Sequence, residues 1–318
     1  MISYIIRKIL MLIPMLLVLT FLVYLGLELM PGDPVSYMIG PEAASLAPEQ
    51  LDAMRQALGL DQPFLVRYWL WLQGVLTGNF GFSLSSGQPI SGILAAKLPA
   101  TLQLSVAALI FSSAAGVVLG VVSALRRGTA VDNSLTVLGM IGLSIPEFFL
   151  GLVLVSVFAI RLGWFPAAGR IEPGDTSWVQ QLDNLFLPAM ALGVAMSAGV
   201  MRYSRAAMLD ARNKAFVVTA RSKGMPEWRV NLIHGFRVAL TPVVVLVGFR
   251  LPILIGGSVV IEQIFQWPGI GLEFITAVRG QNYPLIMMIT LLSVSAVLIS
   301  SLVVDLVTAW IDPRVRLE

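Results

Sequence analysis

Long apolar segments alternate with short polar segments along most of the chain. A helix needs roughly 20 apolar residues to cross about 30 Å of hydrocarbon at about 1.5 Å per residue. Runs near this length predict spans at Ile9–Met30, Thr101–Leu125, Asn133–Ile160, Leu185–Met201, Val238–Ile261 and Pro284–Thr308. The pattern therefore predicts an all-α membrane protein with about six transmembrane helices.

The composition supports the same fold class and restricts the chemistry. Hydrophobic residues make up 57% of the chain and charged residues 12%, whereas about a quarter of the residues in a soluble domain are charged. Cysteine is absent, which excludes disulfides, thiolate metal sites and thiol catalysis. The single histidine, His234, lies in a basic loop and is interpreted as a surface or packing residue rather than a ligand.

The apolar runs divide the chain into four parts. We expect an N-terminal transmembrane helix at 1–30, an external segment at 31–98, a five-helix core at 99–308 with a cytoplasmic loop at 202–237, and a tail at 309–318. The first run follows Arg7 and Lys8, as in a signal peptide. It is longer than a typical signal-peptide apolar region and lacks a small-residue cleavage site, so we interpret it as a retained helix.

Basic residues predict the orientation of the chain in the membrane. Loops on the side of the termini hold fourteen Lys and Arg residues, against six in the other loops. The positive-inside rule then places both termini in the cytoplasm. The basic residues are dispersed among short loops and form no stripe, which favours membrane orientation over nucleic-acid binding as the reason for the net charge of +3.

Glycine and proline recur within the spans, and aromatic residues gather in the external segment. Small residues in a span let helices approach closely, and the positions concerned are Gly116, Gly120, Pro146, Pro188, Gly256 and Gly257. In the external segment, the spacing of apolar residues predicts a helix over Pro48–Leu58. Tyr68, Trp69 and Trp71 suit the headgroup level of a bilayer.

The loop at 202–237 contains a short helix that cannot span. Asn213 is expected to cap it, Lys214–Lys223 holds no helix breaker, and Gly224 with Pro226 ends it. Its length is about 15 Å. Three residues share one face at helical spacing: Phe216, Val217 and Ala220. Such a helix either lies along the inner membrane surface or enters a groove on a partner protein.

The residues from Thr219 to Gly224, Thr-Ala-Arg-Ser-Lys-Gly, resemble the EAA loop of binding-protein-dependent ABC importers, specifically the di-/oligopeptide and nickel permease family. In that family this loop is the coupling helix that docks on the ATPase subunit. Further matching motifs occur in order along the whole chain: Pro31-Gly32-Asp33-Pro34, Asn79-Phe80-Gly81-Phe82-Ser83, Pro89-Ile90, Arg126-Arg127-Gly128, Ser144-Ile145-Pro146, Glu262 with Ile264-Phe265, Trp267-Pro268-Gly269-Ile270-Gly271, and Asp312-Pro313-Arg314-Val315-Arg316.

The resemblance implies a type I ABC importer permease, of the first of the two paralogous subunit types. It implies ATPase-coupling roles for Ala215, Phe216, Val217, Thr219, Ala220, Arg221, Lys223 and Gly224, with Phe216, Ala220 and Gly224 at the centre of the contact. Two positions depart from the general motif. Val218 stands where the motif has a glutamate, and Thr241-Pro242 replaces its closing Leu-Pro.

The chain holds no Gly-x-x-x-x-Gly-Lys-[Ser/Thr] phosphate loop. We therefore expect no cofactor and no catalytic residue in this chain, with ATP and Mg²⁺ bound by partner subunits. The expected partners are a paralogous permease, two ATPase subunits or domains, an external solute-binding protein and lipid of a bacterial plasma membrane, with no nucleic acid. The external segment is expected to lie against the binding protein, to cover the outer mouth of the path or to brace the first span.

Peptides are the expected substrates, with nickel, glutathione and other small solutes as alternatives, because these importers take their specificity largely from the binding protein. Two other functional classes fit the sequence less well. An intramembrane enzyme needs a nucleophile and base at membrane depth, whereas His234 lies in a loop. An ion-coupled secondary transporter commonly has inverted repeats with interrupted helices, but Pro146 has no counterpart in a second half.

Two ionisable residues fall near the middle of the predicted spans. Glu147 lies fifteen residues beyond Asp132, and Arg250 lies thirteen beyond Arg237, so we expect both at a similar depth. A lone charge at the bilayer centre costs at least about 2.5 kcal/mol, so both side chains should face the bundle interior. They either form a structural ion pair or line the translocation path.

Overall fold

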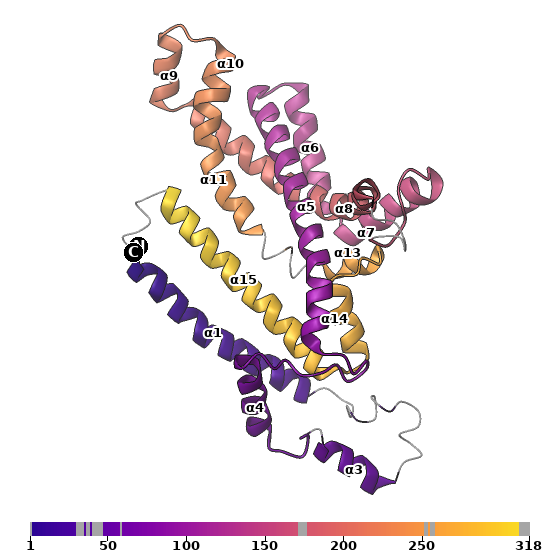
Figure 1. Ribbon diagram of the computed structural model, residues 1–318. Coiled ribbons are helices and arrows are strands. Elements are labelled where there is room, and N and C mark those ends of the chain that lie inside the picture. The colour runs from indigo at the N-terminus through magenta and orange to yellow at the C-terminus, as the bar shows by residue number, and fades with distance from the viewer. Residues whose placement is uncertain are drawn as a thin grey trace. The chain divides into compact units, whose positions relative to one another are not determined.

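The computed structural model is built almost entirely of helices (Figure 1). It describes residues 2–29, 35, 39, 47–57, 59–170, 177–250, 254 and 258–311. Within these ranges the extended backbone makes only an isolated bridge, between Phe82 and Pro89. Several predicted features lie outside the described residues: the Pro31–Pro34 motif, Leu58, Gly256, Gly257 and the Asp312–Arg316 motif.

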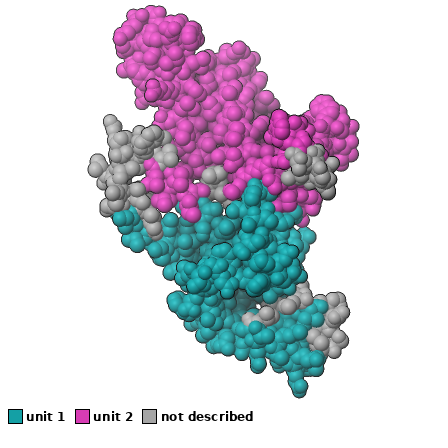
Figure 2. Space-filling view, viewed as in Figure 1, with its two compact units in different colours: residues 1–100, 269–298 teal, residues 101–268, 299–318 magenta. Residues whose placement is uncertain are grey.

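The chain divides into two compact units (Figure 2). Unit 1 comprises Met1–Ala100 and Gly269–Leu298, and unit 2 comprises Thr101–Pro268 and Ile299–Glu318. Two long helices contribute to both units: α5 (Ile90–Leu125) and α15 (Tyr283–Ile311).

Unit 1 has a core at the point where α5 begins. Ile90, Ile93 and Leu94 on the first turns of α5 are buried against α14 (Ile270–Arg279) and the first turns of α15. An ion pair of 3.6 Å between Lys97 and Glu273 joins α5 to α14. The same unit contains α1 (Ile2–Glu28), α3 (Pro48–Ala57) and α4 (Phe64–Leu76).

The loop between α4 and α5 is held by Asn282, in the turn between α14 and α15. The Asn282 side-chain amide donates to Ser83 Oγ at 2.7 Å and to Ser85 Oγ at 3.2 Å. Its oxygen accepts the Leu84 N–H at 3.2 Å. The described part of the predicted external segment therefore has a defined fold and is not a simple connection.

Unit 2 is organised around α8 (Trp178–Arg212), which has sixteen buried residues. α6 (Ala130–Ser144), α7 (Glu147–Leu154) and α11 (Phe236–Gly248) pack against it. Gly116 and Gly120 of α5 also face α8, and a β-carbon at Gly120 would lie 2.5 Å from the Met201 carbonyl oxygen. The predicted packing role of these two glycines is confirmed.

The described helices include five long and apolar enough to cross a membrane, or six if a bent pair counts as one span. The predicted first and last spans are confirmed as α1 and α15, and the Pro48–Leu58 helix as α3. The second span begins at Ile90 and not at Thr101, because α5 continues through Pro99 and buries its early apolar residues in unit 1. The expected end of the external segment, at residue 98, therefore falls inside α5.

The third span, predicted over Asn133–Ile160, is interrupted by a sharp bend. α6 ends at Ser144, and the chain turns by 101° before Glu147–Arg161, which consists of α7 and the π-helix η2 (Val155–Arg161). Ile145 adopts an extended conformation, with ψ 123°, because the residue before a proline is disfavoured in helical geometry. With fifteen residues, α6 is about 22 Å long and too short to cross alone.

The fourth and fifth spans also differ from their predicted bounds. α8 extends beyond Leu185–Met201 at both ends. Arg202–Arg212, which were predicted to lie in the loop, therefore form the last turns of this helix. The fifth span begins at Glu227, with α10 (Glu227–Arg229) and the π-helix η3 (Val230–Gly235), and continues as α11 to Gly248. The expected end at Ile261 was wrong, because Val259–Ile264 forms the separate helix α13.

Candidate functional site

The predicted coupling helix is α9 (Ala215–Ser222), which lies between α8 and α10 and forms a hairpin with α10 (Figure 1). It is shorter than the expected ten residues. The prediction that Asn213 caps it was wrong, because Asn213 is the C-cap of α8 and its N–H donates to the Asp210 and Ala211 carbonyls. Lys214 occupies the N-cap position of α9 with an extended backbone and no side-chain cap hydrogen bond.

One face of α9 packs on the chain's own residues. Val217 is 1% exposed and Ala220 7% exposed, and both pack with Val230 of η3 and with Met225. The apolar face expected to meet a partner is thus partly covered by the same chain. Burial of this small cluster holds α9 against the start of the next span, because apolar surface removed from water stabilises its packing.

The turn after α9 is a Schellman motif centred on Gly224. The Gly224 N–H donates to the Arg221 carbonyl at 2.9 Å, and the Met225 N–H donates to the Ala220 carbonyl at 3.3 Å. Gly224 has φ +74°, and no atom lies within 4 Å of the position a β-carbon would take. The position requires glycine for its backbone conformation rather than for space.

A charged pair spans the same turn. The Arg221 guanidinium donates to both carboxylate oxygens of Glu227, at 2.7 and 3.2 Å, and Asn231 donates to the same carboxylate at 3.0 Å. The hydrogen bond to Glu227 raises the pKa of the Arg221 guanidinium. The pair is solvent-exposed, so it orients the hairpin more than it stabilises it.

The outward face of the hairpin remains available to a partner. Phe216 is 40% exposed, Val218 55% and Trp228 58%, and the Arg229 guanidinium lies 5.4 Å from the Trp228 ring centroid. The remaining candidate residues at or near this surface are Ala215, Thr219, Arg221, Lys223 and Gly224. The residues of the predicted coupling helix thus separate into a buried pair, Val217 and Ala220, and an exposed set. The exposed set includes Val218, which was not predicted from the sequence as a contact residue.

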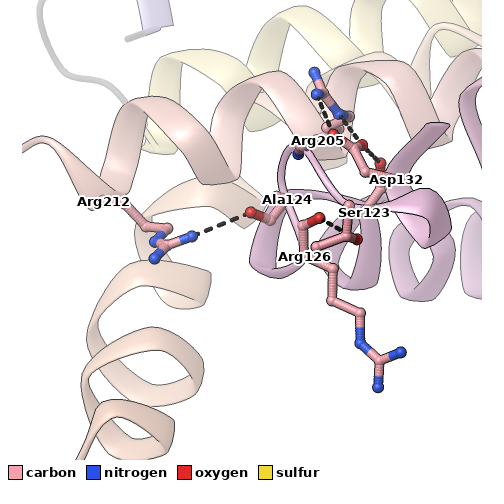
Figure 3. A network of polar contacts seen from close by, with 8 residues as sticks. Ser123, Ala124, Arg126, Asp132, Arg205 and Arg212 are labelled. Carbon is pink, nitrogen blue, oxygen red and sulfur yellow. Dashed lines mark hydrogen bonds and ion pairs between the residues drawn. The ribbon is translucent and has the colours of Figure 1, made fainter.

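A buried polar network joins α5, α6 and α8 close to the end of α8 from which α9 follows (Figure 3). Asp132, 3% exposed, accepts two hydrogen bonds of 2.8 Å from Arg205, one from Ser123 Oγ at 2.5 Å and one from the Gly128 N–H at 3.0 Å. Both carboxylate oxygens of Asp132 therefore accept hydrogen bonds, as a buried charge requires.

The last residue of α8 makes a further link to α5. Arg212 donates to the Ala124 carbonyl at 3.1 Å, whereas the Arg126 side chain points away from the network (Figure 3). Sequence reasoning missed these contacts because it placed Arg205 and Arg212 in a loop. The sequence signal that could have indicated them is Asp132, an acidic residue in the first turn of α6, which directly follows a basic turn.

The two predicted path residues lie in unit 2. Glu147 is the first residue of α7, directly after the bend, and Arg250 lies just beyond α11. No ion pair within 4.0 Å joins these two described side chains. The Arg250 guanidinium packs over Gly199 of α8, where an added β-carbon would collide with it. Both side chains are half-buried.

Two family models match nearly the whole chain. The binding-protein-dependent transport system inner membrane component matches residues 116–317, and the N-terminal domain of the same kind of membrane component matches residues 1–105. The first match includes α9, the Asp132 network, Glu147 and Arg250. The second includes α1, α3 and α4.

Curated relatives align over the full length. A putative peptide permease protein of Brucella suis biovar 1 (strain 1330) is 40% identical over 318 residues, covering 99% of each chain. The oligopeptide transport system permease protein AppB of Bacillus subtilis (strain 168) is 40% identical over 317 residues with the same coverage. The glutathione transport system permease protein GsiC of Escherichia coli (strain K12) is 35% identical over 316 residues, again covering 99% of each.

A solved structure shares the fold. An amino acid ABC transporter crystallised with histidines matches 69% of this chain and 94% of its own, with a TM-score of 0.51 and 17% sequence identity. The chain is an ABC importer permease of the bacterial inner membrane and not an enzyme. It belongs to the family of binding-protein-dependent transport system inner membrane components.

Proposed function

We propose that this chain forms half of the translocation path of a peptide importer. We infer peptides as the substrate class because the chain is 40% identical, over its full length, to permeases named for peptide and oligopeptide transport. Glutathione is the second candidate, because a glutathione permease aligns over the same length at 35% identity. The chain works beside a paralogous permease, above two ATPase subunits or domains and beneath a binding protein, with both of its own termini in the cytoplasm.

The coupling step takes place at α9. The exposed face around Phe216 and Val218 enters a groove on the ATPase, while Val217 and Ala220 hold α9 to the chain's own next span. Movement of the ATPase is transmitted through this buried cluster and through α8, which the Asp132 network ties to α5 and α6. ATP and Mg²⁺ stay on the partner subunits.

The external segment meets the binding protein through the loop that Asn282 holds. Ser85 and Phe82 lie exposed on this loop, and the hydrogen bonds to Asn282 fix its backbone. A crosslink from Ser85→Cys to the binding protein during turnover would support this contact. Absence of the crosslink in an actively transporting complex would contradict it.

Two measurements test the proposal. Mass spectrometry of the solutes that co-purify with the cognate binding protein should identify peptides; recovery of glutathione alone would favour the second candidate. Proteoliposomes that hold the assembled complex should import that solute with ATP and not with an ion gradient. The chain alone should not transport, and ATP-driven uptake by vesicles containing only this chain would refute the expected hetero-oligomer.

A further inference from the structure

α4 carries an apolar surface that the described part of the chain leaves uncovered. Its outward residues are Leu65 (65% exposed), Val66 (41%), Trp69 (55%), Leu70 (55%) and Leu76 (77%). A contiguous exposed apolar patch of this kind marks a surface that contacts protein or membrane. The neighbouring helix α3 has the opposite character, because Glu49, Asp52 and Gln56 lie among its exposed residues.

The opposite face of α4 is anchored on α1, within unit 1. Phe64 and Tyr68 make edge contacts with Phe21 and Tyr24, with ring centroids 5.4 to 5.6 Å apart. Tyr68 Oη lies 3.0 Å from Thr20 Oγ1 and donates to the Leu17 carbonyl at 3.2 Å. These contacts fix which face of α4 is turned outward.

The anchor lies inside the membrane-spanning part of α1. The apolar span there is Leu10–Glu28, of which only 6% is buried by the rest of the chain. Thr20 precedes the end of the span by eight residues, which places it about 12 Å inside. A helix that contacts this level of α1 lies at the depth of the bilayer, beside a surface that the described part of the chain leaves uncovered.

The charges of α4 are arranged to suit that position. Arg67 is the one ionisable residue within Phe64–Leu76 apart from its tyrosine, and it turns inward to pair with Glu28 of α1, with its side chain 16% exposed. The outward face is left with Gln73 as its one polar side chain. Pairing keeps the charge out of hydrocarbon, and aromatic rings beside it suit the interface between headgroups and acyl chains.

We infer that α4 is a membrane-embedded interfacial helix: its face of Leu65, Val66, Trp69, Leu70 and Leu76 inserts into the acyl-chain boundary of the bilayer while its other face braces α1. Interfacial helices of this kind bury an apolar face in the boundary region without spanning. The external segment thus has one part that rests in lipid, α4, and one part with a polar surface, α3. The membrane, by holding α4, limits how far the Asn282-bound loop can move.

Site-directed spin labelling tests this inference, because the chain has no cysteine and each introduced cysteine is unique within it. Labels are placed at Leu65→Cys and Leu70→Cys in the transport-competent importer reconstituted into vesicles of phosphatidylethanolamine and phosphatidylglycerol. Collision with oxygen, which partitions into lipid, is compared with collision with a water-soluble nickel chelate. Matched controls are Leu22→Cys on α1, which is 54% exposed, and Asp52→Cys on α3, whose side chain is 64% exposed.

Both α4 labels should resemble the label at Leu22, with oxygen collisions exceeding nickel collisions, whereas the label at Asp52 should show the reverse. Nickel access at both α4 positions would overturn the inference, since the face would then lie in water. Protection from both reagents would overturn it as well, because protein would then cover the face. If the label at Leu22 is accessible to the nickel chelate, the membrane placement of α1 fails too, which separates that failure from a misplaced α4.

Discussion

Gly224 offers the sharpest test of the hairpin that presents α9. If valine replaces it, a β-branched residue must adopt a φ of +74°. The space around the β-carbon is open, so the backbone conformation is the main cost. The left-handed conformation costs an ordinary residue about 1–2 kcal/mol, and loss of glycine's freedom in the open state offsets under about 1 kcal/mol of that. The net shift of roughly 1 kcal/mol favours opening of the turn about fivefold.

The assay is the number of solute molecules imported per ATP hydrolysed in proteoliposomes containing the full complex. Gly224→Val should lower this ratio several-fold, because α9 is no longer held at a fixed angle to α10. Gly224→Asn should have a smaller effect, since asparagine tolerates this conformation better. Gly78→Val is the matched control, because Gly78 has φ +80° with open space but lies in the predicted external segment, away from α9 in the sequence. A wild-type ratio in a normally assembled Gly224→Val complex would refute the reasoning.

Three further changes test the packing and the path. Asp132→Ala should destabilise the detergent-solubilised complex by about 2–4 kcal/mol, since it leaves Arg205 partly buried and unpaired; thermal unfolding followed by size-exclusion chromatography measures this, and an unchanged midpoint contradicts it. Gly120→Val should prevent assembly, because its side chain overlaps α8, and normal complex yield would contradict that. Neutralising Glu147 and Arg250 singly and together separates a structural pair, in which the double variant recovers assembly, from path-lining groups, for which assembly is normal and transport changes.

The sequence alone predicted the features that depend on local pattern. Long apolar runs located α1 and α15, and Gly224 followed by Pro226 located the end of α9. Each of these depends on the residues of one segment, namely hydrophobic length or a helix stop signal. Such signals need no knowledge of the partners of that segment.

Features that depend on distant partners were not predictable in this way. Asp132 and Arg205 are 73 positions apart, so their pairing has no local signal. The continuation of α5 through Pro99 depends on burial of Ile90 and Leu94 against a segment near the other end of the chain. Tertiary packing of this kind overrides local helix preference.

The apolar face of α9 shows a third limit. Helical spacing placed Val217 and Ala220 on one face, but it could not say whether that face meets a partner or the same chain. Contact with Val230 answers this for the buried face. The exposed side, with Phe216 and Val218, is the surface that the proposed ATPase contact requires.

Crosslinking from Phe216 tests the central claim most directly. Phe216→Cys in the otherwise cysteine-free chain, treated with a short bifunctional maleimide, should couple to the ATPase subunit of the intact complex when that subunit carries a single accessible cysteine in its groove. Phe82→Cys, at a phenylalanine that is 63% exposed in the predicted external segment, should not couple. A crosslink from Phe216 that depends on that groove cysteine is the predicted result; no crosslink from Phe216 in a transporting complex, or an equal one from Phe82, would contradict the account.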